Sequence, residues 1–378
     1  MCSTLVTPFF GYLYDIIGRF WFIIPACFIL SVQIAMIPYS APHIWLLCIF
    51  RAVVSSINNL LQSNPLVMDY VKNESRGLVM SYATVGFVLG EVMMVTLFEF
   101  TRKLTITQQY WMPGLCIGII ASVLIFLVRD PKIKELNPDV SSDSDTSIEL
   151  DNYSTNYENP SVPLEPGVWS KVKNLTLVAT QECRRNPKYL FVFICLFVSR
   201  LIGVLFSVYL QLWVMNFWKT GVIATKEESD SLYMSIILGS LITIAFIAPV
   251  FGFISDKADQ KIIVPAAFMV RGVVAACFCQ IENPYDWSAY ILCILMVNAS
   301  IIQFISVEVL FMKDTNQQIR GTLSGIAFFF GSIGVTIFSL VGGILFDIKP
   351  WAPFLLVASA DGIILVISLI FICLGLLN

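Results

Sequence analysis

Polar side chains recur at helical spacing inside two long apolar stretches of this sequence, and they are the residues best placed to contact a solute. In residues 44–70 and 189–217 the polar positions are three or four residues apart, which places each set on one face of a helix. Such side chains are costly in lipid, so they should face a water-filled interior or one another. The first set is Arg51, Ser55, Asn58, Gln62, Pro65 and Asp69, and the second is Arg200, Gly203, Ser207 and Gln211.

Charged side chains within the apolar stretches indicate two kinds of chemistry. Arg200 lies near the middle of its stretch without an acid at the same depth, and a guanidinium group binds a carboxylate or phosphate through its planar fork. We therefore expect Arg200 to recognise an anion, with backbone carbonyls or water as its alternative partners. Glu91 and Glu308 are candidate proton carriers, because a carboxyl group shielded from water holds its proton more readily.

Depth along the helices predicts two ion pairs. At about 1.5 Å per residue, Arg51 and Glu91 lie at similar depths below one membrane surface, and so do Arg271 and Asp361. The first pair is as compatible with a functional role as with helix packing. For the second pair, packing is the favoured interpretation.

The composition excludes a soluble fold. Of the 378 residues, 57% are hydrophobic and only 13% are charged, compared with about 25% charged in soluble domains. The chain has no basic patch that would predict nucleic-acid binding, and its ten cysteines contain no CxxC pair, so we interpret them as small packing residues. We expect no metal, no cofactor and no enzymatic activity, because no apolar stretch combines a nucleophile with a base.

Ten apolar stretches are long enough to cross a bilayer as helices, which takes about 20 residues. Nothing alternates in polarity, which argues against a barrel. Residues 1–12 are apolar but too short to cross, and a charged turn follows them, so we expect them to end a helix that begins upstream. The predicted spans are 20–38, 44–70, 77–100, 109–128, 189–217, 231–254, 262–280, 286–312, 323–346 and 352–377.

Two sequence markers recur in the second half at nearly the same offset, 241 residues for one and 244 for the other. All four copies lie at turns on one side of the predicted membrane, which indicates two homologous halves in parallel. Lysine and arginine are more frequent in the loops on that side, so the positive-inside rule makes it cytoplasmic. The markers are Gly11 with Asp15 against Gly252 with Asp256, and Arg76-Gly77 against Arg320-Gly321.

The segment between the halves is predicted to be a cytoplasmic linker over 129–188. Its middle, 140–167, has no basic residue and is rich in serine, asparagine and acids, a composition typical of disorder. The domain division is then 1–128 for an incomplete N-terminal bundle and 189–378 for a six-helix C-terminal bundle. The predicted fold class is all-α, a polytopic transmembrane helical bundle with ten full helices and one partial helix.

The turn after residue 10 and its later counterpart resemble the loop motif of the major facilitator superfamily, and the resemblance extends over essentially the whole chain. It implies the twelve-helix transporter fold of that family, with two pseudo-repeated bundles around a central cavity. The ten spans would be helices three to twelve, so helix one and most of helix two are expected to be missing. The matching positions are Gly11, Asp15, Gly18 and Arg19, then Gly252, Asp256 and Lys257, then Arg51, Pro65, Asp69 and Arg76-Gly77.

The resemblance also implies alternating access by rocking of the two halves, with the first motif as a latch whose charges pair in one state and separate in the other. A purely structural role in holding a tight turn is the alternative. Helices four and seven line the cavity in this family, and helix ten adds polar residues that form no clean stripe. The implied latch residues are Gly11, Asp15, Gly18, Arg19, Asp69, Gly252, Asp256 and Lys257; the candidate substrate-binding residues are Arg51, Asn58, Gln62, Arg200, Ser207, Gln211, Asn298 and Gln303.

One position departs from a pattern of the family. Antiporters often carry a Gly-Pro motif in helix five, whereas this chain has Gly86-Phe-Val-Leu-Gly90 without proline. Antiport is therefore not implied. The GxxxG spacing predicts close helix packing at this place instead.

The sequence thus predicts a secondary transporter, in a plasma or organellar membrane, that moves a small polar or anionic solute and uses a proton or another ion as its coupling partner. We expect a monomer. A non-transporting sensor or scaffold with a transporter-like fold is the alternative, suggested by the missing first helix and the long acidic linker. A membrane enzyme is the third and least supported reading.

Overall fold

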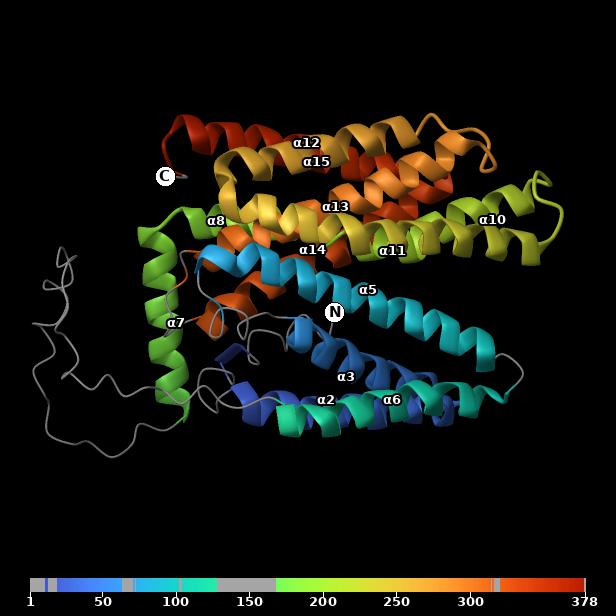
Figure 1. Ribbon diagram of the computed structural model, residues 1–378, viewed down its shortest axis with the longest axis horizontal. Coiled ribbons are helices and arrows are strands. Elements are labelled where there is room, and N and C mark those ends of the chain that lie inside the picture. Colours follow the sequence, from blue (N-terminus) through green and yellow to red (C-terminus); the bar gives the residue numbers. More distant parts are fainter. Residues whose placement is uncertain are drawn as a thin grey trace, which may run out of the picture.

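Every element in the described part of the chain is a helix. The computed structural model describes residues 11–12, 19–62, 71, 73–101, 104–127, 168–313, 315 and 320–376. Most helices run roughly side by side along the long axis of the molecule, whereas α7 lies across one end of them (Figure 1). This arrangement suits a lipid environment, because a helix satisfies its own backbone hydrogen bonds without water.

The long helices begin and end close to the predicted spans. Before the linker they are α2 (Arg19–Met36), α3 (Ile44–Gln62), α5 (Arg76–Thr101) and α6 (Ile106–Leu127), with the short turns η1 (Ile37–Ser40) and η2 (Asn73–Ser75). After it they are α7 (Val168–Arg185), α8 (Lys188–Ser199), α9 (Ile202–Val204), η3 (Leu205–Leu210), α10 (Gln211–Lys219), α11 (Lys226–Lys257), α12 (Gln260–Phe278), α13 (Trp287–Lys313), α14 (Arg320–Ile348) and α15 (Ala352–Cys373).

Nine segments within the described residues are long and apolar enough to cross a membrane, and they correspond to nine of the ten predicted spans. The other prediction, 44–70, is described as helix only as far as Gln62, and its apolar part, Ile44–Ile57, is shorter. Its remainder, 63–70, lies outside the described residues. Length and hydropathy therefore support a chain that crosses the membrane many times.

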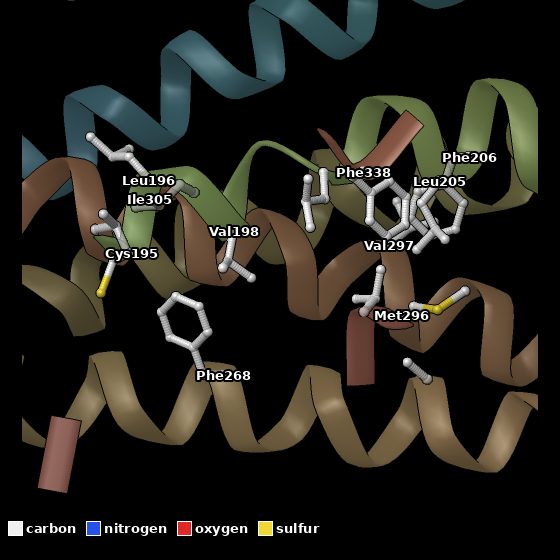
Figure 2. Packing of buried hydrophobic residues seen from close by; sticks show 14 of the residues in the cluster. Cys195, Leu196, Val198, Leu205, Phe206, Phe268, Met296, Val297, Ile305 and Phe338 are labelled. Carbon is white, nitrogen blue, oxygen red and sulfur yellow. The ribbon is translucent and has the colours of Figure 1, made fainter. Parts of the chain in front are cut away.

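Buried apolar side chains form two clusters. The larger cluster joins α7, α8 and the helices after them, and includes Met80 and Val88 of α5. The smaller one joins α2, α3 and α6 around Leu30 and Ile57. Figure 2 shows part of the larger cluster, where side chains of α8, α12 and α13 meet. Because α5 packs along α11, it connects the two groups of helices; the domain division at residue 128 stays a prediction.

The predicted span 189–217 is not one continuous helix. α8 ends at Ser199, a turn follows at Arg200 and Leu201, and the chain continues through α9 and the π-helical turn η3 into α10. No proline lies in this segment, so the usual sequence signal for a kink is missing. We call residues 188–219 the broken helix. Irregular backbone at membrane depth is tolerated where other groups satisfy it.

The linker contains a helix that was not predicted. α7 buries Ala179 and partly buries Leu175, while Lys173 and Leu177 on its other side are exposed. Its Thr176 hydroxyl donates to the hydroxyl of Tyr12 over 2.9 Å. At one end of the molecule, α7 therefore contacts Tyr12 from the first part of the chain and α8 and α14 from the second (Figure 1). The predicted disordered part, 140–167, lies outside the described residues.

Gly86 and Gly90 of α5 do not pack closely. A Cβ atom at either position would meet no heavy atom within 4 Å. The close helix contact predicted from their spacing is therefore wrong. The spacing does put both glycines on one face, but α5 turns the opposite face, which carries Met80 and Val88, toward the larger cluster.

Candidate functional site

The broken helix places Arg200 against α13 and α14. Its Nη2 atom lies 3.4 Å from Oε1 of Glu308, and the two side chains are only 11% and 3% exposed. The guanidinium carbon also lies 3.7 Å from the ring centroid of Phe328 and 5.4 Å from that of Phe304. A cation held between a carboxylate and aromatic faces can exchange its partner for another anion of similar shape.

Gly331 of α14 gives Arg200 the space it occupies. A Cβ atom at this position would lie 2.9 Å from Cδ and 3.1 Å from Cγ of Arg200. The arginine stem therefore lies directly on the backbone of α14. Neither Gly331 nor Phe328 was a predicted site residue, because an apolar, glycine-rich helix gives no sign of what packs on it.

The prediction that Arg200 lacks an acid at its own depth is wrong. Depth was counted along a straight helix, whereas the turn at Arg200 and the π-turn that follows displace the backbone from that line. The long arginine side chain then reaches Glu308, which lies toward the Lys313 end of α13. Arg200, which we expected to recognise an anion, and Glu308, which we expected to carry a proton, thus form one pair.

The predicted pair of Arg271 and Asp361 is present and almost fully buried. Nε and Nη2 of Arg271 lie 2.7 and 2.5 Å from the two carboxylate oxygens, and the side chains are 1% and 0% exposed. Gln303, a predicted substrate contact, directs Nε2 toward the same carboxylate at 3.5 Å. The structure therefore places Gln303 in a buried network between α12, α13 and α15.

The predicted pair of Arg51 and Glu91 is not formed. Both side chains are described, both are exposed, and no ion pair joins them. Equal depth on α3 and α5 is not enough, because α3 packs on α2 and α5 packs on α11.

The other candidate substrate-binding residues are spread along the molecule. Ser207 is exposed and donates to the carbonyl of Gly203, while Gln211 is partly buried at the start of α10. Asn298 is buried and donates over 2.8 Å to the hydroxyl of Thr243. The side chains of Asn58 and Gln62 lie outside the described residues.

A second constellation joins the two groups of helices at the end where α5 begins and α11 ends, which we call the Asp256 end. The carboxylate of Asp256 accepts hydrogen bonds from the backbone nitrogens of Gly77 and Leu78, over 2.6 and 2.8 Å. It therefore caps the first turn of α5, where free amides and the helix dipole favour a negative charge. Arg76 donates to the carbonyl of Met312 on α13 at the same end.

Gly11 makes the counterpart of this contact. A Cβ atom on Gly11 would lie 2.5 Å from the carbonyl oxygen of Gly321 at the start of α14, and one on Gly252 would lie 2.6 Å from that of Gly77 at the start of α5. Each predicted Gly-Asp turn thus meets the Arg-Gly helix start of the other half. The sequence revealed both repeats, but not that they pair across the halves.

The remaining latch residues are described only in part. Lys257 is exposed, and its ammonium group lies 4.1 Å from the ring centroid of Phe253. Arg19 begins α2, but its side chain lies outside the described residues, as do Asp15, Gly18 and Asp69 entirely. Their role as a latch stays a prediction.

Many apolar helices, a broken helix with a buried charge pair, and mutual contacts between repeated turns define the class of polytopic membrane transporters. Residues 1–339 match the family model of the Major Facilitator Superfamily. The chain therefore belongs to the Major Facilitator Superfamily, and it is a multi-pass membrane protein with a transport function rather than an enzyme. The prediction of an all-α polytopic transporter fold is confirmed.

Solved structures share this fold. A structure of FucP in the outward conformation has a TM-score of 0.68 at 13% identity, with 97% of this chain and 86% of that chain covered. The proton:xylose symporter XylE has 0.66 at 12%, with 98% and 83% covered. The human organic anion transporter MFSD10 (TETRAN) has 0.66 at 13%, with 100% and 81% covered. A comparison with curated proteins finds no match.

Proposed function

We propose that this chain carries a small polar or anionic solute across the membrane by alternating access, with Arg200 as the group that recognises the solute. The observation that supports this is the buried pair of Arg200 and Glu308, held on separate helices beside the turn in the broken helix. Apolar residues in place of a buried charge pair are often neutral for stability, so stability alone does not explain the pair. An anionic solute would take the place of Glu308 on the guanidinium fork.

Glu308 is the proposed coupling residue. When it is ionised it competes with the solute for Arg200, and when it is protonated it releases the guanidinium. Solute binding and proton binding at this pair would then favour each other, which is what a symporter needs. The fold is shared with the protein titled a proton:xylose symporter. Glu91, exposed beside the open face at Gly86 and Gly90, is the second candidate.

The Asp256 end is the proposed cytoplasmic gate. Asp256 and Gly252 hold α5 and α11 together there, and these two helices lie closer at this end than at the opposite end (Figure 1). The arrangement would correspond to a state closed to the cytoplasm. Opening requires the carboxylate to leave the first turn of α5, where water can replace it.

Uptake by the purified full chain in liposomes tests the proposal. Labelled monocarboxylates, dicarboxylates and uncharged sugars are offered with an inward proton gradient, and again after a protonophore has removed it. We expect uptake of one anionic or polar class that is stimulated by the gradient. Transport of nothing in the panel, although the protein is folded and reconstituted, would favour the sensor or scaffold alternative.

Variants of the pair identify its role. Arg200→Gln should reduce uptake by roughly tenfold or more, since hydrogen bonds to a charged group contribute about 1.5–3 kcal/mol. Arg184→Gln, on exposed α7, is the matched control and should leave uptake unchanged. Glu308→Gln should retain exchange of labelled for unlabelled solute and lose accumulation driven by the gradient. Unaltered transport and selectivity in Arg200→Gln would eliminate the proposed role of the arginine.

A further inference from the structure

Arg271 makes one bond beyond its ion pair. Its Nη2 atom donates to the backbone carbonyl of Val198 over 3.3 Å. Val198 is the residue before Ser199, the last of α8, and two residues before Arg200. Figure 2 shows Val198 beside the narrow stretch of backbone where the broken helix loses its regular turns, opposite Phe268 of α12. The peripheral ion pair therefore touches the break itself.

The Val198 carbonyl accepts two hydrogen bonds, one from the backbone and one from Arg271. In a regular helix it would accept the amide of residue 202, but here it accepts the amide of Leu201 over 3.3 Å, the tighter spacing of a turn. The oxygen has a second lone pair, which is the one available to Arg271. Arg271 is therefore the second donor to this oxygen, and its charge strengthens the bond at a turn that has lost the regular helical one.

Arg271 is held in place from several sides. The Nε and Nη2 atoms both engage Asp361, and Gln303 engages the same carboxylate. A Cβ atom on Gly272 would lie 3.1 Å from Cβ of Asp361, so α12 and α15 approach closely at this point. The guanidinium group is thus fixed before it reaches Val198. Replacing a buried ion pair by apolar residues is often neutral for stability, so packing alone does not explain it.

We propose that Arg271 is a positioning residue for the solute site: anchored by Asp361, it fixes the Val198 carbonyl and so holds the turn that directs Arg200 toward Glu308. This inference rests on the proposed function only in taking Arg200 as the solute contact. The claim about the turn itself concerns the backbone of the broken helix. It can therefore be tested without any knowledge of the solute.

Amide hydrogen exchange of the full chain in nanodiscs is the test. In Arg271→Gln we expect residues 199–205 to exchange roughly tenfold faster or more than in the wild type, because a hydrogen bond from a charged donor is lost at the turn. Arg271→Lys should act in the same direction, since a compact ammonium group lacks the planar fork that binds both carboxylate oxygens and also reaches the carbonyl. Ser368→Ala is the control, because this buried hydroxyl of α15 bonds only within its own helix.

A charge swap separates positioning from packing. Arg271→Asp combined with Asp361→Arg rebuilds a buried pair but moves the guanidinium to α15, so stability should recover while 199–205 still exchange fast. The proposal is overturned if the swap restores slow exchange at 199–205, if Arg271→Gln leaves these amides as in the wild type, or if exchange rises equally over α12, α13 and α15. If Arg271→Gln does not fold, the lysine variant and the swap decide. If the wild type transports no solute, the proposed function is wrong, but the hydrogen-exchange result at 199–205 still decides the role of Arg271.

Discussion

The carboxylate of Asp256 lies 2.6 Å from the backbone nitrogen of Gly77, although 179 positions separate the two residues in the chain. A residue at the end of one helix thus caps the beginning of another helix from the other half. The contact is charge-assisted, because the free amides of a first turn carry a partial positive charge. It is also easily reversed, since water can serve both groups once they part.

Asp256→Asn should weaken the contact at the Asp256 end. An amide carries no charge and has an NH2 group in place of one of the two accepting oxygens, so the charge-assisted bonds to Gly77 and Leu78 are weakened, and we expect the closed state to lose about 1–2 kcal/mol. One spin label is placed at the start of α5 and one at the end of α11. The distribution of distances between the two labels should then broaden and extend to larger values. Asp259→Asn is the control, because Asp259 caps only its own helix, through the amide of Lys261 at 3.0 Å. Equal distance distributions in wild type and Asp256→Asn would contradict the gate.

Gly252→Ala should push α5 and α11 apart. The added Cβ would meet the hydroxyl oxygen of Ser81 and lie 2.6 Å from the carbonyl of Gly77, and overpacking of this kind costs roughly 1–3 kcal/mol. The same spin-label pair should report the same direction of change as Asp256→Asn. Gly239→Ala in the same helix has ordinary contacts, with a nearest atom at 3.8 Å. A similar response of both alanine variants would show that the effect is not specific to the gate.

Gly331→Ala should impair the solute site without touching a charged residue. The added methyl group would lie 2.9 Å from Cδ of Arg200, so the arginine stem must move away from α14 and its reach to Glu308 must change. We expect uptake in liposomes to fall in the manner of Arg200→Gln, with an effect of roughly 1–3 kcal/mol. Gly343→Ala in α14 has no heavy atom within 4 Å of the new Cβ and should transport normally. Normal uptake by Gly331→Ala would argue against the fixed position of Arg200.

Tyr285, in the loop between α12 and α13, should resist ionisation. Its hydroxyl donates to Glu228 over 2.7 Å, which raises the pKa of Tyr285 to about 12. Because the pKa of Tyr285 is higher in the folded state, its hydrogen bond to Glu228 contributes fully to stability below the ordinary tyrosine pKa of about 10. This contribution disappears as the pH rises through about 12. At a pH of about 11, Tyr285 should still be protonated, so the tyrosinate absorbance of the wild type should equal that of Tyr285→Phe. When Glu228→Gln is added to both proteins, Tyr285 should ionise, and the two absorbances should differ.

The sequence predicted the membrane spans well because apolar length and charged turns act locally. Depth counting also found the partner of Arg271, since α12 and α15 pack side by side. Depth counting failed for Arg200, because the helix is broken there without a proline to signal it. It failed for Arg51 because α3 and α5, which carry Arg51 and Glu91 at similar depths, pack mainly on different helices. Pairing between halves, as for Asp256 and Gly77, depends on tertiary packing that no local pattern encodes.

The helix in the linker has a mechanical consequence. Only Asn186 and Pro187 separate α7 from α8, and Thr176 bonds to Tyr12 at the other end of the chain. A flexible linker would let the two halves tilt independently of each other. If α8 moves relative to the first part of the chain during the proposed alternating access, α7 should either move with α8 or lose the hydrogen bond between Thr176 and Tyr12.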